Sequence, residues 1–520
     1  MLRTILFTIA IFVFALGANA QPNNVSQVLM WSMVGDTPIG ASSSQSPVLP
    51  DGTRFLPNTS GTLPRALFGV YTVTGAINAT SDLNTVSNYS TGNLSALNSA
   101  ISSSVAVALS VIPVASPASA VIQKKDPVTG GDLATNATLG PIFTQRAETI
   151  GKGQFYIGIS HQSFHFTDFN GQRLNGITLL DPSTNRRSAS VAAAQGGPAP
   201  VTYNLATDVR LSQDIAFITT GLTNRVELSV GLPMVHAAVA STAYNGIVYS
   251  GAGLGNPSGS AQPGNCWCIN TLSPGTFRLT QPGVIGAASM AKTGFGDLLI
   301  RAKGAVLSTT NTVVSVGGDL RLPTGDADNY LGIGTAAVKP FVAVSYYKKM
   351  SRGFMFSPHF DVGWQFAGKS VLGGQLTGSP QTATMANGDK ISYQGAPLAV
   401  RQNDFIPDVF TWSAGAEWAL GNRNTLVTDI LGNQIGWVHG APQLQLASAP
   451  GLSPVAPYSS VNASGMVGVG KTSFGQYNGS IGYKALVAGK LVASFNVLIR
   501  IDDNSLTSRI SPLFGLSYTF

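Results

Sequence analysis

The sequence has little charge, few cysteines and no second run of apolar residues after its N-terminus that is long enough for a membrane-spanning helix. Asp, Glu, Lys and Arg make up 10% of its 520 residues, whereas typical soluble proteins contain about 25%. A transmembrane helix needs roughly 17–25 apolar residues, yet the mean hydropathy is positive. These absences argue against both an ordinary soluble protein and a helical membrane protein.

The only two cysteines, Cys266 and Cys268, flank Trp267 in a loop-like stretch. They are too few for a disulfide framework or a four-ligand zinc site, so we expect no metal and no cofactor. A local disulfide between them stays open in an oxidising compartment. The formal charge is +7, but the basic residues are scattered, so nucleic acid is not an expected partner.

Residues 1–20 have the pattern of a secretory signal peptide. Arg3 precedes an apolar run from Ile5 to Leu16, and Ala18-Asn19-Ala20 is a small-x-small cleavage pattern. The run is too short to cross a bilayer as a helix. We therefore expect an exported protein whose mature chain starts near Gln21.

From about residue 154 onward, apolar residues recur at every second position, the pattern of strands with one apolar face. Leu491–Ile501 and Phe354–Phe366 are the clearest cases, with Ser, Asn, His, Asp or Arg on the opposite face. The pattern predicts about twelve strands, each long enough to cross an outer membrane. They lie near 154–167, 203–219, 224–240, 294–307, 312–323, 338–349, 354–368, 408–420, 424–435, 473–487, 490–502 and 508–520.

The predicted connections alternate between long and short. This asymmetry is typical of bacterial outer-membrane barrels, which have long extracellular loops and brief periplasmic turns. We therefore predict that residues 141–520 form an all-β transmembrane antiparallel barrel in the bacterial outer membrane. The alternative, a secreted sandwich or propeller, fits less well, because strands of that class usually have about 3–10 residues.

The last predicted strand is apolar on one parity and ends in an aromatic residue. Phe514, Leu516, Tyr518 and Phe520 lie on the face expected to meet lipid. We expect this strand to serve insertion through the barrel-assembly machinery. We also expect it to pair with the strand near Gln154–Thr167, because a closed barrel leaves no free edge.

Residues 21–140 are rich in Ser, Thr, Asn and Ala and have few alternating runs, so we treat them as a separate N-terminal region. Apolar residues from Leu94 to Ile112 recur at spacings of three or four and stop at Pro113. This spacing predicts one helix. The helix could plug or line the barrel mouth, or it could pack against the periplasmic end of the barrel.

Several motif matches lack the structural context that their chemistry needs. Residues 465–472 match the phosphate-loop pattern G-x-x-x-x-G-K-[ST], but an alternating stretch follows in place of a helix, so no nucleotide is expected. Gly332-Ile333-Gly334 is likewise followed by a strand. Asp326 and Asp328 do not continue into a calcium loop. The chain has five histidines and no G-x-S-x-G motif, so an enzyme is not expected, although strands could still bring a histidine beside a Ser or Asp.

The faces opposite the apolar ones carry charges of both signs. Burying so many charges in a dry core costs several kcal/mol each unless they are paired. They therefore indicate either a solvated conduit or a closed barrel whose wall is cross-linked by ion pairs. The residues predicted to line the lumen are Asp208, Arg210, Asp214, Arg225, Glu227, Asp297, Arg301, Lys303, Asp319, Arg321, His359, Asp361, Glu417, Asp429, Lys484 and Arg500.

Three sequence stretches carry a resemblance to a known family. They are Thr293–Lys303 (TGFGDLLIRAK), Gly318–Gly334 (with GDLRLPTGD and LGIG) and Lys339–Phe366 (with KPF and FSPHFDVGWQF). Over roughly 140–520 the chain resembles the bacterial family labelled MetA-pathway of phenol degradation. The resemblance implies an outer-membrane transporter of aromatic or other hydrophobic compounds.

These observations together predict a channel or transporter that passes small, aromatic or hydrophobic solutes through a polar-lined barrel. Its expected partners are outer-membrane lipid and a small solute. One alternative is a structural or adhesive barrel with a filled lumen. Another is a barrel hydrolase.

Overall fold

The computed structural model describes residues 24–28, 91–111, 139, 144–181, 201–248, 284–349, 355–374, 376–385, 390–401, 403–421, 423–446 and 467–520, together with the short strands β1 to β6, β13 and β14. The predicted signal peptide and both cysteines lie outside the described residues. Within the described part of the chain, no helix combines the length and apolar character needed to cross a membrane.

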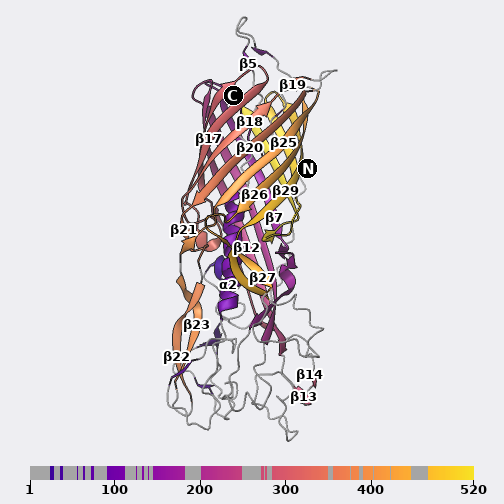
Figure 1. Cartoon of the computed structure of the whole chain (residues 1–520). Helices are drawn as coiled ribbons and strands as arrows, with labels where there is room; N and C mark the ends of the chain where they lie inside the picture. Colours follow the sequence, from indigo (N-terminus) through magenta and orange to yellow (C-terminus); the bar gives the residue numbers. More distant parts are fainter. Residues whose placement is uncertain are drawn as a thin grey trace, which may run out of the picture.

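The described strands form a closed antiparallel barrel of 12 strands, which confirms the predicted fold class (Figure 1). Each strand pairs with its neighbours along the chain, so the barrel is an up-and-down meander. The barrel strands are β7 (Phe155–Phe166), β11 (Val201–Gly221), β12 (Val226–Val248), β16 (Leu298–Ser308), β17 (Thr312–Leu322), β18 (Ala337–Tyr346), β20 (Met355–Ala367), β25 (Val409–Leu420), β26 (Asn424–Ile435), β29 (Phe474–Ala488), β30 (Leu491–Arg500) and β32 (Ile510–Thr519).

The barrel closes between its last and first strands, as the sequence predicted. β32 pairs antiparallel with β7 in a register that places Leu516 opposite Ile159 and Tyr518 opposite Ile157. The amide of Phe520 adds a hydrogen bond of 2.8 Å to the carbonyl of Phe155. The closure leaves no unpaired edge between β32 and β7, as a strand that crosses lipid requires.

The two ends of the barrel differ. At one end, which also carries the C-terminus, the strands are joined by short turns such as Leu222–Arg225 (top in Figure 1). At the other end the wall continues beyond the barrel, because β10 (Ile177–Asp181) pairs with β11 and β15 (Val284–Phe295) pairs with the far half of β12. By the usual asymmetry the short turns face the periplasm and the long loops face the exterior.

Further elements accompany the long loops and the N-terminal region. The helical ones are η1 (Val25–Gln27), α2 (Thr91–Val111), η5 (Leu174–Gly176) and η6 (Ala327–Asn329). The strands are β1 (Asp36–Pro38), β2 (Phe55–Leu56), β3 (Thr62–Pro64), β4 (Thr72–Thr74), β5 (Lys124–Lys125), β6 (Asp132–Leu133), β8 (Asp168–Phe169), β9 (Gln172–Arg173), β13 (Thr271–Ser273), β14 (Thr276–Phe277), β19 (Lys348–Lys349), β21 (Lys369–Ser370), β22 (Leu376–Met385), β23 (Lys390–Arg401), β24 (Asp404–Phe405), β27 (Ala441–Leu446), β28 (Val467–Thr472) and β31 (Leu506–Thr507).

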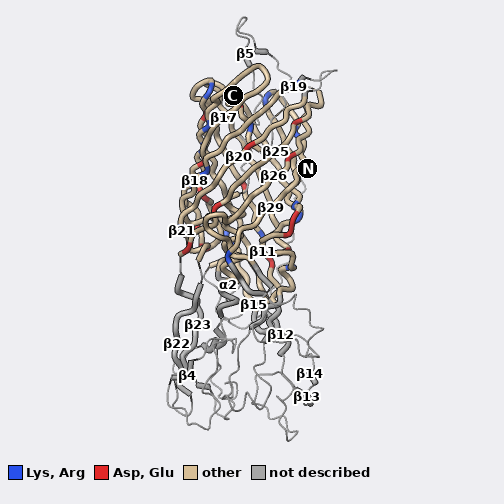
Figure 2. The backbone as a smooth tube through the Cα atoms, viewed as in Figure 1, with Lys and Arg blue, Asp and Glu red and all other residues tan. Residues whose placement is uncertain are grey.

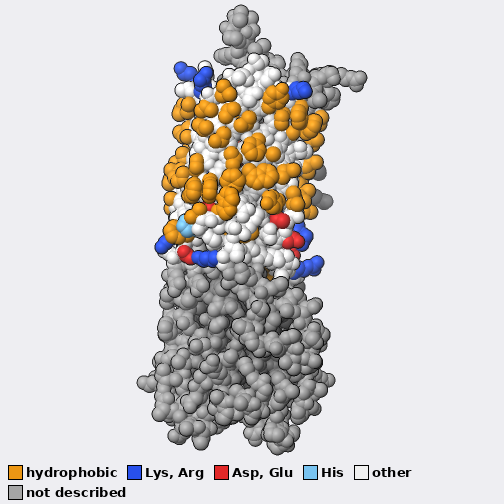
Figure 3. Space-filling view, in the orientation of Figure 1, with side chains coloured by type: hydrophobic (Ala, Val, Ile, Leu, Met, Phe, Trp, Pro, Cys, Tyr) orange, Lys and Arg blue, Asp and Glu red, His pale blue; other side chains and the backbone are white. Residues whose placement is uncertain are grey.

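A belt of apolar side chains covers the outside of the barrel (Figure 3). It is bordered by basic side chains at the short-turn end and by charges of both signs at the other end, while Figure 2 shows further charged positions along the barrel strands. A belt of this kind suits contact with lipid tails. Its exposed members include Ile159, Val230, Leu232, Val316, Val342, Phe360, Ile430, Ile481, Phe495 and Leu516.

The lipid-facing belt can be tested by placing a charge in it. Ile430 is 52% exposed on β26, whereas Trp437 is 56% exposed beyond the end of that strand. We expect Ile430→Lys to lower the free energy of unfolding in lipid vesicles by about 2–4 kcal/mol and Trp437→Lys by about 0–1 kcal/mol. Equal losses for both variants, measured by urea titration, would show that this face does not lie in the hydrocarbon.

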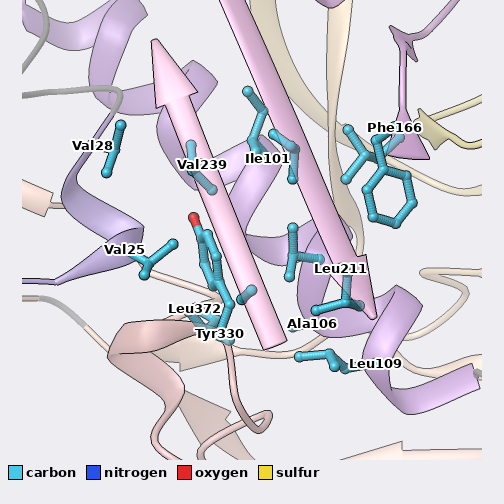
Figure 4. Close-up of a cluster of buried hydrophobic side chains, with 14 of the residues drawn as sticks. Val25, Val28, Ile101, Ala106, Leu109, Phe166, Leu211, Val239, Tyr330 and Leu372 are labelled. Carbon is cyan, nitrogen blue, oxygen red and sulfur yellow. The ribbon is translucent and has the colours of Figure 1, made fainter. Parts of the chain in front are cut away.

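The largest buried apolar cluster surrounds α2 and lies within the long-loop half of the barrel (Figure 4). Ile101 and Leu109 of the helix pack toward wall residues such as Leu211 and Val239. The helix matches the prediction for residues 94–112. From Leu97 onward its serines are also buried, because protein surrounds this part of the helix on every side. The helix lies inside the barrel wall at the long-loop end and not against the short-turn end, which agrees with the first of the two predicted positions.

Candidate functional site

Most of the charged residues predicted to line the lumen have buried side chains inside the barrel. Their positions follow the strand alternation, since they lie opposite the exposed apolar faces. The buried members on barrel strands are Glu227, Arg301, Lys303, Asp319, Arg321, His359, Asp361, Glu417, Asp429 and Lys484. Asp297 is buried too, but it lies in the connection between β15 and β16. Arg500 lies at the end of β30, where it forms an ion pair of 3.2 Å with Asp502.

The prediction is wrong for Asp208, Arg210, Asp214 and Arg225, whose side chains are partly or fully exposed. The first three lie on the outer face of β11, and Arg225 lies in the turn before β12. On β11 the inner face is uncharged and mostly apolar, and it packs against α2 and Tyr156. On this strand the charged residues therefore face outward, whereas the prediction placed the charged residues of every strand in the lumen.

The exposed β11 charges pair with histidines of β7. Asp214 lies 2.8 Å from the Nδ1 atom of His161, and Asp208 lies 3.1 Å from the Nε2 atom of His165. Arg210 also donates to Asp208 at 2.7 Å. These pairs lie on the lipid-facing side of the wall, outside the lumen.

A further ion pair joins the loops beside the barrel seam. Arg509 donates to Asp168 at 3.1 Å, and β31 pairs with β8. Burial of Asp168 acts to raise the pKa of its carboxyl, but hydrogen bonds from Thr167 and Arg509 outweigh it and hold that pKa below its usual value. The carboxylate therefore stays ionised, and the loops that follow β7 and β30 stay joined.

Polar contacts hold α2 at the long-loop end. The hydroxyls of Ser102 and Tyr330 lie 2.7 Å apart, as do those of Ser104 and Ser505. Burial raises the pKa of Tyr330 to about 12, so its hydroxyl keeps its proton for this hydrogen bond. Deeper in the barrel, Arg321 donates to the carbonyl of Ser110 at 3.2 Å. This places a cation at the last turn of the helix, where the helix dipole favours it.

A second segment, residues 144–150, fills the short-turn half of the lumen. It has no regular secondary structure, and side chains of the wall hold its backbone. The amide of Gln145 donates to Asp361 at 2.9 Å, and the amide of Ala147 donates to Ser345 at 2.9 Å. Lys303 donates to the carbonyls of Arg146 and Glu148 at 2.8 and 2.7 Å. We call residues 144–150 the lumen segment.

The same wall side chains also pair with one another. The ammonium of Lys303 lies 2.9 Å from Glu227, and the other oxygen of Glu227 accepts the amide of Ile150 at 2.9 Å. Arg301 binds Asp319 through two parallel hydrogen bonds of 2.6 and 2.8 Å. A bidentate ion pair of this kind fixes the orientation of both side chains and favours their charged forms. The lumen segment therefore rests on a wall whose charges are already organised.

A histidine links two carboxylates across β25. The Nε2 atom of His359 on β20 lies 3.0 Å from Asp429 on β26, and its Nδ1 atom lies 3.7 Å from Glu417. Gly415 of β25 lies beneath this contact. A Cβ atom there would lie 2.0 Å from Asp429 and 2.6 Å from His359, so glycine leaves the space in which the two side chains meet.

One cavity lies between the last turn of α2 and Gln145. It holds about 60 Å³ and is bounded by Arg301, Arg321, Lys339, Asp361 and other inward side chains. Sequence reasoning missed Lys339, because β18 has apolar residues on both faces. It also missed Gln145, Arg146 and Glu148, since no periodicity marks the lumen segment.

The weak motif matches have ordinary structural roles. Residues 467–472 of the phosphate-loop match form β28, a strand paired with β27, so no helix N-terminus is present there. Asp326 caps η6 by accepting the amide of Asp328 at 3.0 Å. The amide of Ile333, within the Gly332–Gly334 match, donates to Asp297 at 2.7 Å.

A closed barrel with an apolar outer belt and a charged interior is the architecture of an outer-membrane protein. The fold, the belt and the lumen together place this chain in that class. The model of a family described as "Putative MetA-pathway of phenol degradation" matches residues 188–429. This match confirms the resemblance read from the sequence.

No curated protein sequence matches the chain significantly. The solved structures similar to it include the COG4313 outer membrane channel from Pseudomonas putida F1, with 10% identity and a TM-score of 0.35 over 72% of this chain and 98% of that one. The NanC porin has 8% identity and a TM-score of 0.29 over 69% and 98% of the two chains. The CymD monoaromatic hydrocarbon channel has 10% identity and a TM-score of 0.26 over 71% and 88%.

Proposed function

We propose that the chain is an outer-membrane channel that its own N-terminal region closes. In this account α2 and the lumen segment form a plug, and small solutes pass when the plug moves. The inward residues of the wall then line the conduit. Aromatic or hydrophobic solutes are the class that the family resemblance suggests, in agreement with the match over residues 188–429.

The way in which the lumen segment is attached carries this proposal. Its described residues pair with no barrel strand, and wall side chains make its hydrogen bonds. Glu227, Lys303, Asp361 and Asp429 are charged groups that water would hydrate once the segment left. Burying such groups permanently brings little stability, because desolvation cancels much of the attraction. A charged wall that can be uncovered is more consistent with a conduit than with a fixed core.

We also propose the route by which the barrel reaches the membrane. Residues 1–20 direct export, and the terminal strand β32 is recognised by the barrel-assembly machinery. The exposed aromatic side chains of Phe514, Tyr518 and Phe520 support this role for the strand.

The second candidate function is a structural or adhesive barrel with a permanently filled lumen. The small volume of the cavity and the burial of α2 favour it. The two functions differ in permeation, because a filled barrel does not speed the passage of solutes.

Liposome swelling tests the proposed function. We expect the full-length protein to speed the entry of glycine and acetate well above the rate in protein-free liposomes, and to exclude a trisaccharide. The control is Lys303→Ala, which removes the ammonium that binds the carbonyls of Arg146 and Glu148 and so weakens the plug. Swelling no faster than in protein-free liposomes, for both the wild type and Lys303→Ala, would favour the filled barrel.

A further inference from the structure

The cavity between α2 and the lumen segment has an uneven distribution of charge. Its volume of about 60 Å³ gives room for about five water molecules, at roughly 10–15 Å³ of such volume each. Three neighbouring strands, β16, β17 and β18, contribute the cations Arg301, Arg321 and Lys339. The opposite wall is mostly neutral: it includes Gln365, Thr411 and Asn433, and its one charged lining residue is Asp361 on β20.

The anions of the cavity already have partners. Asp319 accepts two hydrogen bonds from the guanidinium of Arg301. Asp361 accepts the amide of Gln145 and the hydroxyl of Ser413. Both carboxylates therefore have fewer free lone pairs with which to bind the other two cations, Arg321 and Lys339.

Lys339 and Arg321 are the cations with capacity to bind a solute. Among the described residues, Lys339 has no hydrogen bond and no carboxylate within 4.0 Å of its ammonium, and its side chain is partly exposed to the cavity. Its stem passes over Gly363, where an added Cβ atom would lie 3.1 Å from Cε. Arg321 forms a single described hydrogen bond, to the carbonyl of Ser110.

The remaining lining suits the uncharged part of a solute. Leu299, Leu431 and Val111 provide apolar surface beside the cations. Among the described residues, the Nε2 atom of Gln365 is buried without a hydrogen-bond partner, so one amide donor is also available. A guanidinium and an ammonium side by side favour a carboxylate.

We propose that this cavity binds small organic carboxylates and makes the channel selective for anions. The proposal rests on the proposed function, because a solute reaches the cavity only through an open lumen. The carboxylate takes the place of the Ser110 carbonyl on Arg321 and pairs with Lys339. Its short hydrocarbon part lies against Leu299 and Leu431. Binding of the solute therefore competes directly with a contact that holds the last turn of α2.

Planar-bilayer recordings in gradients of potassium chloride and potassium acetate test this inference. The reversal potential gives the ratio of anion to potassium permeability for the wild type and for variants opened by Lys303→Ala. We expect a preference for both anions, and a fall of about threefold or more in the ratio for Lys339→Gln. Lys339→Arg, which keeps the charge, should retain the preference. Arg210→Gln, which removes a cation from the outer face, should leave the ratio unchanged.

The outcomes separate this inference from the proposed function. Measurable currents without anion preference, or with a ratio that is the same in Lys339→Gln and the wild type, would overturn the carboxylate site and leave the channel intact. A complete lack of conductance in both the wild type and Lys303→Ala would overturn the channel and the site with it. Heat-modifiable migration in gels shows that each variant is a folded barrel.

Discussion

Replacing Lys303 with alanine is expected to raise the fraction of time that the channel spends open by about a hundredfold or more. The ammonium of Lys303 binds Glu227 and two carbonyls of the lumen segment, and the Lys303 and Glu227 side chains are 2% and 1% exposed. Its loss leaves Glu227 buried without its cation, which costs about 3–5 kcal/mol. That cost falls on the closed state, because water reaches Glu227 once the lumen segment has moved. Single-channel recording measures the change.

Two further variants show whether the buried charge is the cause. The double variant Lys303→Ala with Glu227→Gln removes the unpaired charge, so its opening should lie between the wild type and the single variant. Lys348→Ala removes an exposed cation of β19 and should leave opening as in the wild type. A folded Lys303→Ala barrel that opens as rarely as the wild type would show that this contact does not hold the plug.

The architecture of the barrel could be predicted from the sequence because lipid contact imposes a simple pattern. A strand with lipid outside and a polar interior shows period-two alternation, as β20 and β30 do. The alternation of long and short connections fixed the even strand count and the pairing of β32 with β7. Both signals are local in the sequence, so no tertiary contact was needed to read them.

The contents of the lumen could not be predicted in the same way. The inner face of β11 is uncharged and mostly apolar because α2 packs on it, and that contact joins residues about a hundred positions apart, such as Ile101 and Leu211. The lumen segment has no periodicity, because its backbone is held by side chains of distant strands. Lys339 lies on a strand that has apolar residues on both of its faces. The alternation of apolar and polar residues therefore did not show whether its side chain points into the lumen or toward lipid.

In the proposed mechanism, solutes pass only after the N-terminal region has left the lumen. A disulfide between α2 and the long-loop end prevents that movement. The hydroxyls of Ser104 and Ser505 lie 2.7 Å apart and both residues are buried, so Ser104→Cys with Ser505→Cys brings two sulfurs within bonding reach. Cys266 and Cys268 are replaced by serine to exclude other pairings, and Lys303→Ala is included so that the unlocked channel opens often.

The most direct measurement is the conductance of this locked protein before and after reduction in the same bilayer. We expect the oxidised protein to conduct no more than a protein-free membrane, and we expect a reducing agent to restore the openings seen without the two new cysteines. Mass spectrometry verifies that the disulfide has formed. Equal conductance in the oxidised and reduced states, with the disulfide intact in the first, would contradict the claim that the N-terminal region closes this barrel.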